Sequence, residues 1–194
     1  SRVEWSRVQI LGGDERCVPP DLKESIYRLA RETLLDLVPV PAATVHRIRG
    51  EDDPVAAAGR YEATLRMLFQ APVGPAGARP GASIDLILLG LGGDGHTASL
   101  FPGSAAVRER TRWVTAERAA ATSLWRVTLT PAVINAAVEV LFLVSGSAKA
   151  RILRRVLEGP RHPAELPAQV VAPVHGRVHW LVDAAAASEL GKRP

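Results

Sequence analysis

The alternation of apolar and polar segments predicts a chain of strands and helices. The most apolar segment, 84–89, runs without a polar break from Leu86 to Leu89, which is typical of a strand buried on both faces of a parallel sheet. We therefore expect a central strand there. Further apolar or alternating segments predict strands at 7–11, 44–48, 112–117, 125–130, 138–144 and 177–183.

Helix signals lie between these strands. Asp53 followed by Pro54 predicts a helix that runs to about Phe69. Asp21 and Glu24 have the spacing of a capping box, Ser147 is placed to cap a helix ending near 158, and the alanine-rich segment 184–190 predicts a terminal helix. The proline- and glycine-rich segment 71–82 predicts a loop. This alternation predicts a single α/β domain over 1–194, a three-layer sandwich with a mostly parallel sheet.

Candidate chemistry follows the strand at 84–89. Four glycines crowd the next six positions and let a ligand approach main-chain N–H groups: Gly90, Gly92, Gly93 and Gly95. Asp94 and His96 lie in the same loop, and a histidine can pass a proton near neutral pH. Because ligands bind at the carboxyl ends of strands in open α/β sheets, we expect a site here. The glycines also spell G-x-G-x-x-G, but the histidine that follows argues against a dinucleotide site.

Composition narrows the function classes. The chain has 194 residues, 47% hydrophobic and 23% charged, with a net charge of +4 and a pI near 9.8. This charge suits an anionic ligand, while the lack of basic runs with interleaved aromatics argues against nucleic-acid binding. No segment approaches the roughly 18 apolar residues of a membrane helix, and the polar start does not resemble a signal peptide, so we expect no membrane partner and a cytoplasmic protein.

Cys17 is the single cysteine, which excludes an internal disulfide and a cysteine-rich metal site. It follows an Asp-Glu-Arg triplet closely enough to raise the hypothesis of a nucleophile. A buried small hydrophobic side chain is the favoured interpretation.

Three ordered motifs carry a family resemblance: GGDERCVPP at 12–20, GLGGDGHTASLFPG at 90–103 and VLFLVSGSAKARILRRVLEG at 140–159. Together they resemble the 6-phosphogluconolactonase family of the pentose phosphate pathway, which implies a modified Rossmann-type fold. Glucosamine-6-phosphate deaminase, in the same superfamily, shares the turn but continues with Phe-Asn-Glu-Pro and has a tyrosine after its Asp-Glu pair. Arg16 and the segment 97–102 favour the lactonase.

The resemblance implies roles for named residues. His96 is expected to be the general base that activates water, and Asp94 and Asp14 are expected to orient the imidazole or the hydroxyls of the substrate. The candidate phosphate ligands are Arg16, Arg126 and Lys149, and the amides of Gly92 and Gly93 are candidates for stabilising an oxyanion. Lys149 is expected in the first turn of a helix, where an ammonium group is favourable only beside an anion. The substrate would be a sugar-phosphate lactone, and no metal or organic cofactor is expected.

Members of the resembled family begin with an additional strand and a Ser-Gly-Gly loop that helps to bind phosphate, whereas this sequence starts at Ser1 just before the first motif. We therefore expect an amino-terminally truncated chain. A catalytically silent sugar-phosphate-binding module is the alternative to an enzyme. The sequence does not indicate an oligomeric state.

Overall fold

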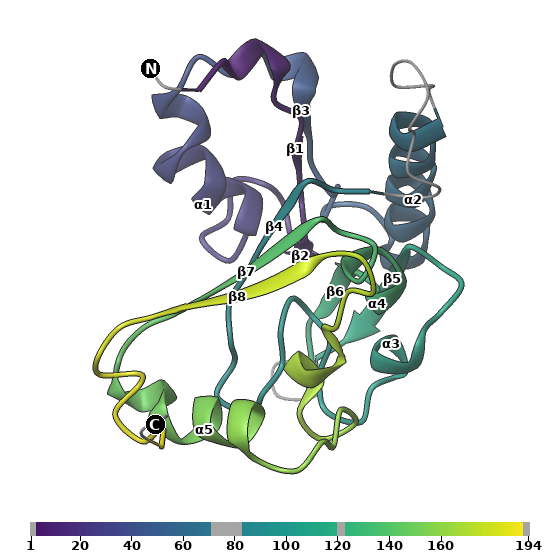
Figure 1. Cartoon of the computed structure of the whole chain (residues 1–194). Helices are drawn as coiled ribbons and strands as arrows, with labels where there is room; N and C mark the ends of the chain where they lie inside the picture. Colours follow the sequence, from purple (N-terminus) through teal and green to yellow (C-terminus); the bar gives the residue numbers. More distant parts are fainter. Residues whose placement is uncertain (1–2, 71–82, 120–122, 192–194) are drawn as a thin grey trace.

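The computed structural model describes residues 3–70, 83–119 and 123–191, so the predicted loop at 71–82 lies outside the described residues. The strands of the described part form three sheets (Figure 1). The parallel pair joins β1 (Ile10–Leu11) to β3 (Val45–His46), the antiparallel sheet has the order β2 (Asp14–Arg16), β6 (Trp125–Leu129), β5 (Val114–Arg118), and the second parallel sheet has the order β4 (Leu86–Leu89), β7 (Glu139–Val144), β8 (Arg177–Val182).

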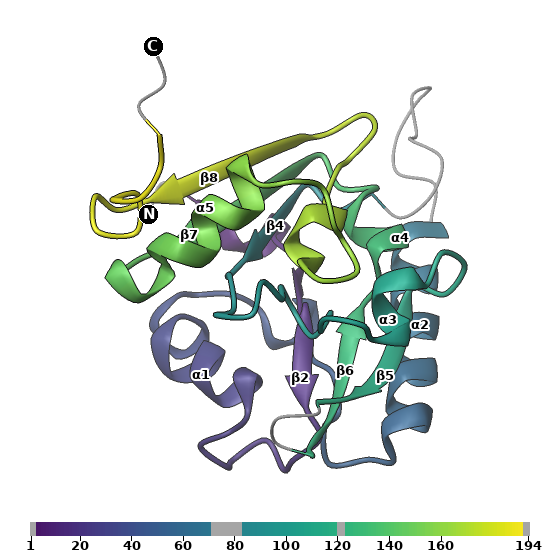
Figure 2. The same cartoon turned by 90° about the horizontal axis from the view of Figure 1, so that it is seen from below.

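The β4-β7-β8 sheet holds the main core. Its buried face includes Leu89, Val140 and Phe142, and the Phe142 ring stacks on Trp180 of the next strand with ring centroids 3.9 Å apart. Helix α5 (Ala150–Glu158) lies along this sheet and buries Ile152, Leu153 and Val156 (Figure 2).

The opposite face of this sheet corrects one prediction. Leu86 and Leu88 are 52% and 58% exposed, whereas Leu89 is 6% exposed, so β4 alternates and is not buried on both faces. Nor is β4 the central strand, because β7 pairs on both of its sides and β4 pairs only with β7 in the described part of the chain. A continuous apolar run does not indicate which face of the strand packs against other parts of the protein. Because the face of β4 that carries Leu86 and Leu88 is mostly exposed, the third layer of the predicted sandwich stays a prediction.

The β2-β6-β5 sheet is antiparallel, whereas the sequence predicts one mostly parallel sheet. The charged triplet at 14–16 follows the short strand β1 and is itself a strand, paired antiparallel with β6. The backbone pairing extends to both sides of the triplet, since the Leu129 N–H donates to the Gly13 carbonyl and the Cys17 N–H donates to the Trp125 carbonyl. The expected mostly parallel sheet is therefore divided into two parallel parts and one antiparallel part.

Helix α2 (Pro54–Gln70) confirms the predicted start, because the Asp53 carboxylate accepts a hydrogen bond from the Ala56 N–H. Helix α1 (Ile26–Thr33) begins later than the Asp21 capping box predicts, and the Ser25 hydroxyl caps it by accepting from the Arg28 N–H. Segment 184–190 forms turns instead of a terminal helix. The remaining helices are short: η1 (Trp5–Arg7), η2 (Leu35–Leu37), η3 (Ala42–Thr44), α3 (Ala105–Arg108), α4 (Pro131–Ile134), η4 (Ser147–Lys149) and η5 (Pro167–Val170). Among the described residues, no helix has the length and apolar character needed to cross a membrane.

Neighbouring leucines of β4 test the one-sided burial. We expect Leu89→Ala to lower the free energy of unfolding by about 2–4 kcal/mol, because it opens a cavity in the core. Leu88→Ala removes the same atoms from a mostly exposed position, and the loss should be about 0.5 kcal/mol. Urea unfolding of both variants measures the difference, and equal losses would contradict the alternation.

Candidate active site

The glycine-rich loop after β4 folds into a tight turn around His96. The Gly92 N–H donates to the His96 carbonyl at 2.8 Å, the Gly95 N–H donates to the Gly92 carbonyl at 3.0 Å, and Gly95 has a φ of 87° that favours glycine. A Cβ atom on Gly92 would overlap the His96 imidazole. Gly92 therefore leaves the space that the imidazole occupies.

The two glycine amides differ in what they can do. The Gly92 N–H is committed to the His96 carbonyl, so the expectation that it stabilises an oxyanion needs correction. The Gly93 N–H has no partner among the described residues and remains a candidate. The distinction depends on the folded turn and could not come from counting glycines.

Asp94 orients the imidazole. Its Oδ1 lies 2.5 Å from His96 Nδ1 and also accepts from the His96 N–H at 3.1 Å. Burial opposes ionisation of Asp94, but these hydrogen bonds outweigh it and hold the pKa of Asp94 below its usual value. Because an ionised carboxylate only accepts, it keeps a proton on Nδ1 and leaves the lone pair of the neutral imidazole on Nε2.

Ser99 connects this loop to the antiparallel sheet. Its buried hydroxyl donates to Asp14 Oδ2 at 2.7 Å, and its N–H donates to the Thr128 hydroxyl at 3.2 Å. Burial raises the pKa of Asp14, against the lowering effect of Ser99 and of the charges on Arg16 and Arg126. The structure thus brings Asp14 to the histidine loop. Sequence reasoning missed Ser99, although it is a small polar residue inside the 90–103 motif.

Arg16 and Arg126 lie directly opposite each other on β2 and β6. Burial lowers the pKa of Arg126, and the charge of Arg16 lowers it further. Arg126 Nε is buried and has no hydrogen-bond partner in the described part of the chain. Because like charges directly opposite each other destabilise a sheet, this pair favours an anion that can accept from both guanidinium groups.

Phe101 contacts both the imidazole and Arg126. Its ring centroid is 4.9 Å from that of His96, and the Arg126 guanidinium carbon is 6.0 Å from the same ring. Phe101 therefore connects the His96 imidazole to the pair of arginines. No pattern in the sequence indicates a role for Phe101.

Lys149 lies at the same sheet edge as the glycine loop. It ends η4, which follows β7, and β7 pairs in parallel with β4. Lys149 itself takes the N-cap position of α5, and Ser147 makes no side-chain cap, which corrects the expected start of that helix. Among the described residues, the Lys149 ammonium group makes no hydrogen bond or ion pair, and no contact joins its side chain to the histidine loop.

Cys17 is half-buried beside this site. Burial, and then the nearby Glu15 charge, raise the pKa of the Cys17 thiol to about 11. A neutral thiol is a poor nucleophile, so the interpretation as a small hydrophobic side chain is favoured. Within the described residues, no group of three or more His, Cys, Asp and Glu side chains is placed to hold a metal ion.

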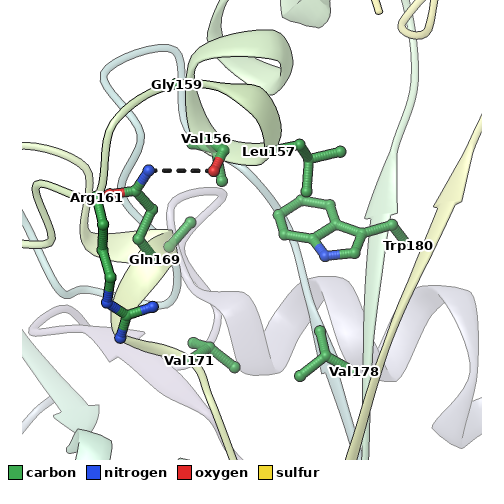
Figure 3. A pocket seen from close by; sticks show the side chains of 9 residues that line it. Val156, Leu157, Gly159, Arg161, Gln169, Val171, Val178 and Trp180 are labelled. Carbon is green, nitrogen blue, oxygen red and sulfur yellow. Dashed lines mark hydrogen bonds between the residues drawn. The ribbon is translucent and has the colours of Figure 1, made fainter. Parts of the chain in front are cut away.

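A hollow of about 320 Å³ lies elsewhere, between α5 and β8 (Figure 3). Trp180, Val178 and Leu157 form its apolar side, and the Gln169 amide donates to the Val156 and Pro160 carbonyls. None of the candidate residues lines it. Its buried amide serves the fold, so the candidate site remains the loop at 90–103 with β2 and β6.

Comparison with known proteins defines the class. The family model described as glucosamine-6-phosphate isomerases/6-phosphogluconolactonase matches residues 1–180. The chain belongs to this family. A 6-phosphogluconolactonase from a Nostoc species is 36% identical over 97% of this chain and 76% of the relative, and the human 6-phosphogluconolactonase is 41% identical over 90% of this chain and 65% of the relative.

Solved structures agree with this assignment. The devB protein superposes with a TM-score of 0.87 at 33% identity, covering 97% of this chain and 76% of that protein. The 6-phosphogluconolactonase from Trypanosoma brucei has a TM-score of 0.76 at 33% identity, covering 93% and 73%. A monomeric glucosamine-6-phosphate deaminase has a TM-score of 0.76 at 22% identity over 97% and 77%, which shows a shared fold alone.

The raised pKa of Cys17 predicts slow alkylation. With a pKa about two units above the ordinary value of 9.0, the folded protein at pH 7 should hold about 100-fold less thiolate than the unfolded chain. The rate of iodoacetamide labelling with and without urea measures this ratio. Equal rates would show that Cys17 is exposed or activated.

Proposed function

We propose that this protein hydrolyses 6-phospho-D-glucono-1,5-lactone to 6-phosphogluconate, the step that opens the lactone in the oxidative pentose phosphate pathway. The observation that carries the proposal is the connection of the Asp94-oriented imidazole, through Phe101, to the paired guanidinium groups of Arg16 and Arg126. The lactone has an ester carbonyl, at which the imidazole can activate water, and a phosphate dianion, to which the paired guanidinium groups can donate. The named 6-phosphogluconolactonase relatives support the same substrate.

His96 is the general base in this proposal. Its Nε2 accepts a proton from water as the water oxygen attacks the lactone carbonyl carbon, and Asp94 stabilises the imidazolium that forms. The bond from the carbonyl carbon to the ring oxygen then breaks, and the imidazolium returns its proton to the departing ring oxygen. The Gly93 N–H is the candidate donor to the oxyanion of the tetrahedral intermediate.

Binding uses the charged side chains. Arg16 and Arg126 hold the phosphate, since guanidinium groups match phosphate oxygens bidentately, and Lys149 adds a point charge from the same sheet edge. Asp14 is the candidate acceptor for a substrate hydroxyl. The deaminase alternative is disfavoured because Arg16 and the segment 97–102 replace the deaminase motifs.

The proposed location of this activity is the cytoplasm. A cytoplasmic location fits the free thiol of Cys17, because disulfides are rare in that compartment.

A three-layer arrangement of the family fold is supported by the parallel β4-β7-β8 sheet and by α5, which lies along one of its faces.

Loss of the base tests the activity. We expect the chain to open the freshly generated lactone above the spontaneous rate, and His96→Ala to lower kcat about 10²- to 10⁴-fold. Coupled detection with 6-phosphogluconate dehydrogenase measures the product. A parent chain that binds 6-phosphogluconate but never exceeds the spontaneous rate would favour the silent binding module.

The space over Gly92 gives a second test. Gly92→Ala should displace the imidazole and lower kcat about 100-fold, because small displacements of a reacting group are costly. Gly90→Ala is the matched control, since a Cβ atom there meets nothing within 4 Å and kcat should stay close to that of the parent chain. Equal effects of the two substitutions would contradict the steric role of Gly92.

A further inference from the structure

Glu15 is a buried carboxylate that the mechanism does not use. It is 4% exposed and lies between Asp14 and Arg16 on β2. Its oxygens accept from the Ile26 and Tyr27 N–H groups, both at 2.7 Å, and from the Ser25 hydroxyl at 3.1 Å. The carboxylate therefore holds the first turn of α1, where the free N–H groups of a helix favour a negative charge.

The same turn receives the side chain of Arg16. Arg16 Nη1 donates to the Glu24 carbonyl at 2.8 Å, and Glu24 immediately precedes the three residues that Glu15 holds. The Arg16 N–H also donates to Glu15 Oε1 at 2.8 Å. Glu15 thus fixes both the backbone of Arg16 and the carbonyl that restrains its guanidinium. Figure 2 shows α1 beside β2, as this arrangement requires.

Arg16 needs such a restraint because of its neighbour. The Arg126 guanidinium on the opposite strand repels it, and a long side chain has the rotamer freedom to move into solvent. The Glu24 carbonyl opposes that movement only while the first turn of α1 stays in place.

We propose that Glu15 is a positioning residue that holds Arg16 in the geometry that binds the phosphate group of the substrate. This inference rests on the proposed function, in which Arg16 is a phosphate ligand. It predicts that loss of the Glu15 carboxylate weakens recognition of phosphate and leaves proton transfer at His96 nearly unchanged.

The decisive variant is Glu15→Gln, which keeps the volume but replaces one acceptor oxygen with an NH₂ group that faces N–H donors. We expect KM for the phosphorylated lactone to rise about tenfold or more, as for the loss of a charge-assisted hydrogen bond. The KM for unphosphorylated D-glucono-1,5-lactone and kcat for both lactones should change little, which a general loss of folded protein would not produce.

Glu62→Gln is the matched control. The Glu62 side chain is 18% exposed, accepts from the Trp113 and Val114 N–H groups at 3.0 and 3.2 Å, and pairs with Arg66, all away from Arg16. It should lower the melting temperature, as we also expect of Glu15→Gln, and leave both KM values unchanged. If Glu15→Gln does not fold, Ser25→Ala removes one of the donors to Glu15 and should shift KM in the same selective direction by a smaller factor.

The Arg16→Ala variant distinguishes a failure of the inference about Glu15 from a failure of the proposed function. If Arg16→Ala raises KM for the phosphorylated lactone and Glu15→Gln has no larger effect than Glu62→Gln, the positioning role of Glu15 is overturned. If Glu15→Gln raises KM equally for both lactones, its role is structural only and the inference also fails. If Arg16→Ala itself leaves KM unchanged, the phosphate role of Arg16 in the proposed function fails.

Discussion

The antiparallel pairing of β2 with β6 is the constraint on which the site depends. It places Arg16 opposite Arg126, and with them Asp14 opposite Thr128, on strands whose backbones hydrogen-bond to each other. Two facing guanidinium groups repel each other and destabilise the protein without ligand. A phosphate dianion that accepts from both relieves this repulsion, which strengthens its binding. The Ser99 hydrogen bond to Asp14 then attaches the histidine loop to this sheet.

In the proposed function, proton transfer and anion binding depend on separate sets of local contacts. The imidazole is set by contacts within its own loop, namely the Asp94 carboxylate and the space over Gly92. The guanidinium of Arg16 is set from outside the loop, by the first turn of α1. Phe101 is the contact between the two parts. This separation is why substitutions are expected to affect kcat and KM independently.

Two local signals in the sequence predicted the structure correctly. Asp53 and Pro54 mark the start of α2, and the glycine loop with Asp94 and His96 lies after β4, as expected. Two features that the sequence did not predict depend on distant partners. The charged triplet at 14–16 forms a strand because it pairs with β6, more than a hundred residues later, and α1 starts at Ile26, where Glu15 holds the first turn.

The burial of the β4 leucines and the roles of Ser99 and Phe101 could not be predicted, because they depend on contacts made only in the folded chain. Leu86 and Leu88 have the same side-chain type as the buried Leu89, so no pattern in the segment could tell which face is covered. The roles of Ser99 and Phe101 arise from contacts with β2 and β6. The family resemblance identified the motifs, and only the structure brought Asp14, Arg16 and Arg126 next to the histidine loop.

Ligand-linked stability tests the central claim, that the paired arginines recognise phosphate, most directly. At about 100 times its dissociation constant, 6-phosphogluconate should raise the melting temperature by about 5–10 °C, whereas gluconate at the same concentration should have little effect. The shift should be lost in Arg126→Ala. Equal shifts with both ligands, or a full shift in Arg126→Ala, would contradict a phosphate site between β2 and β6.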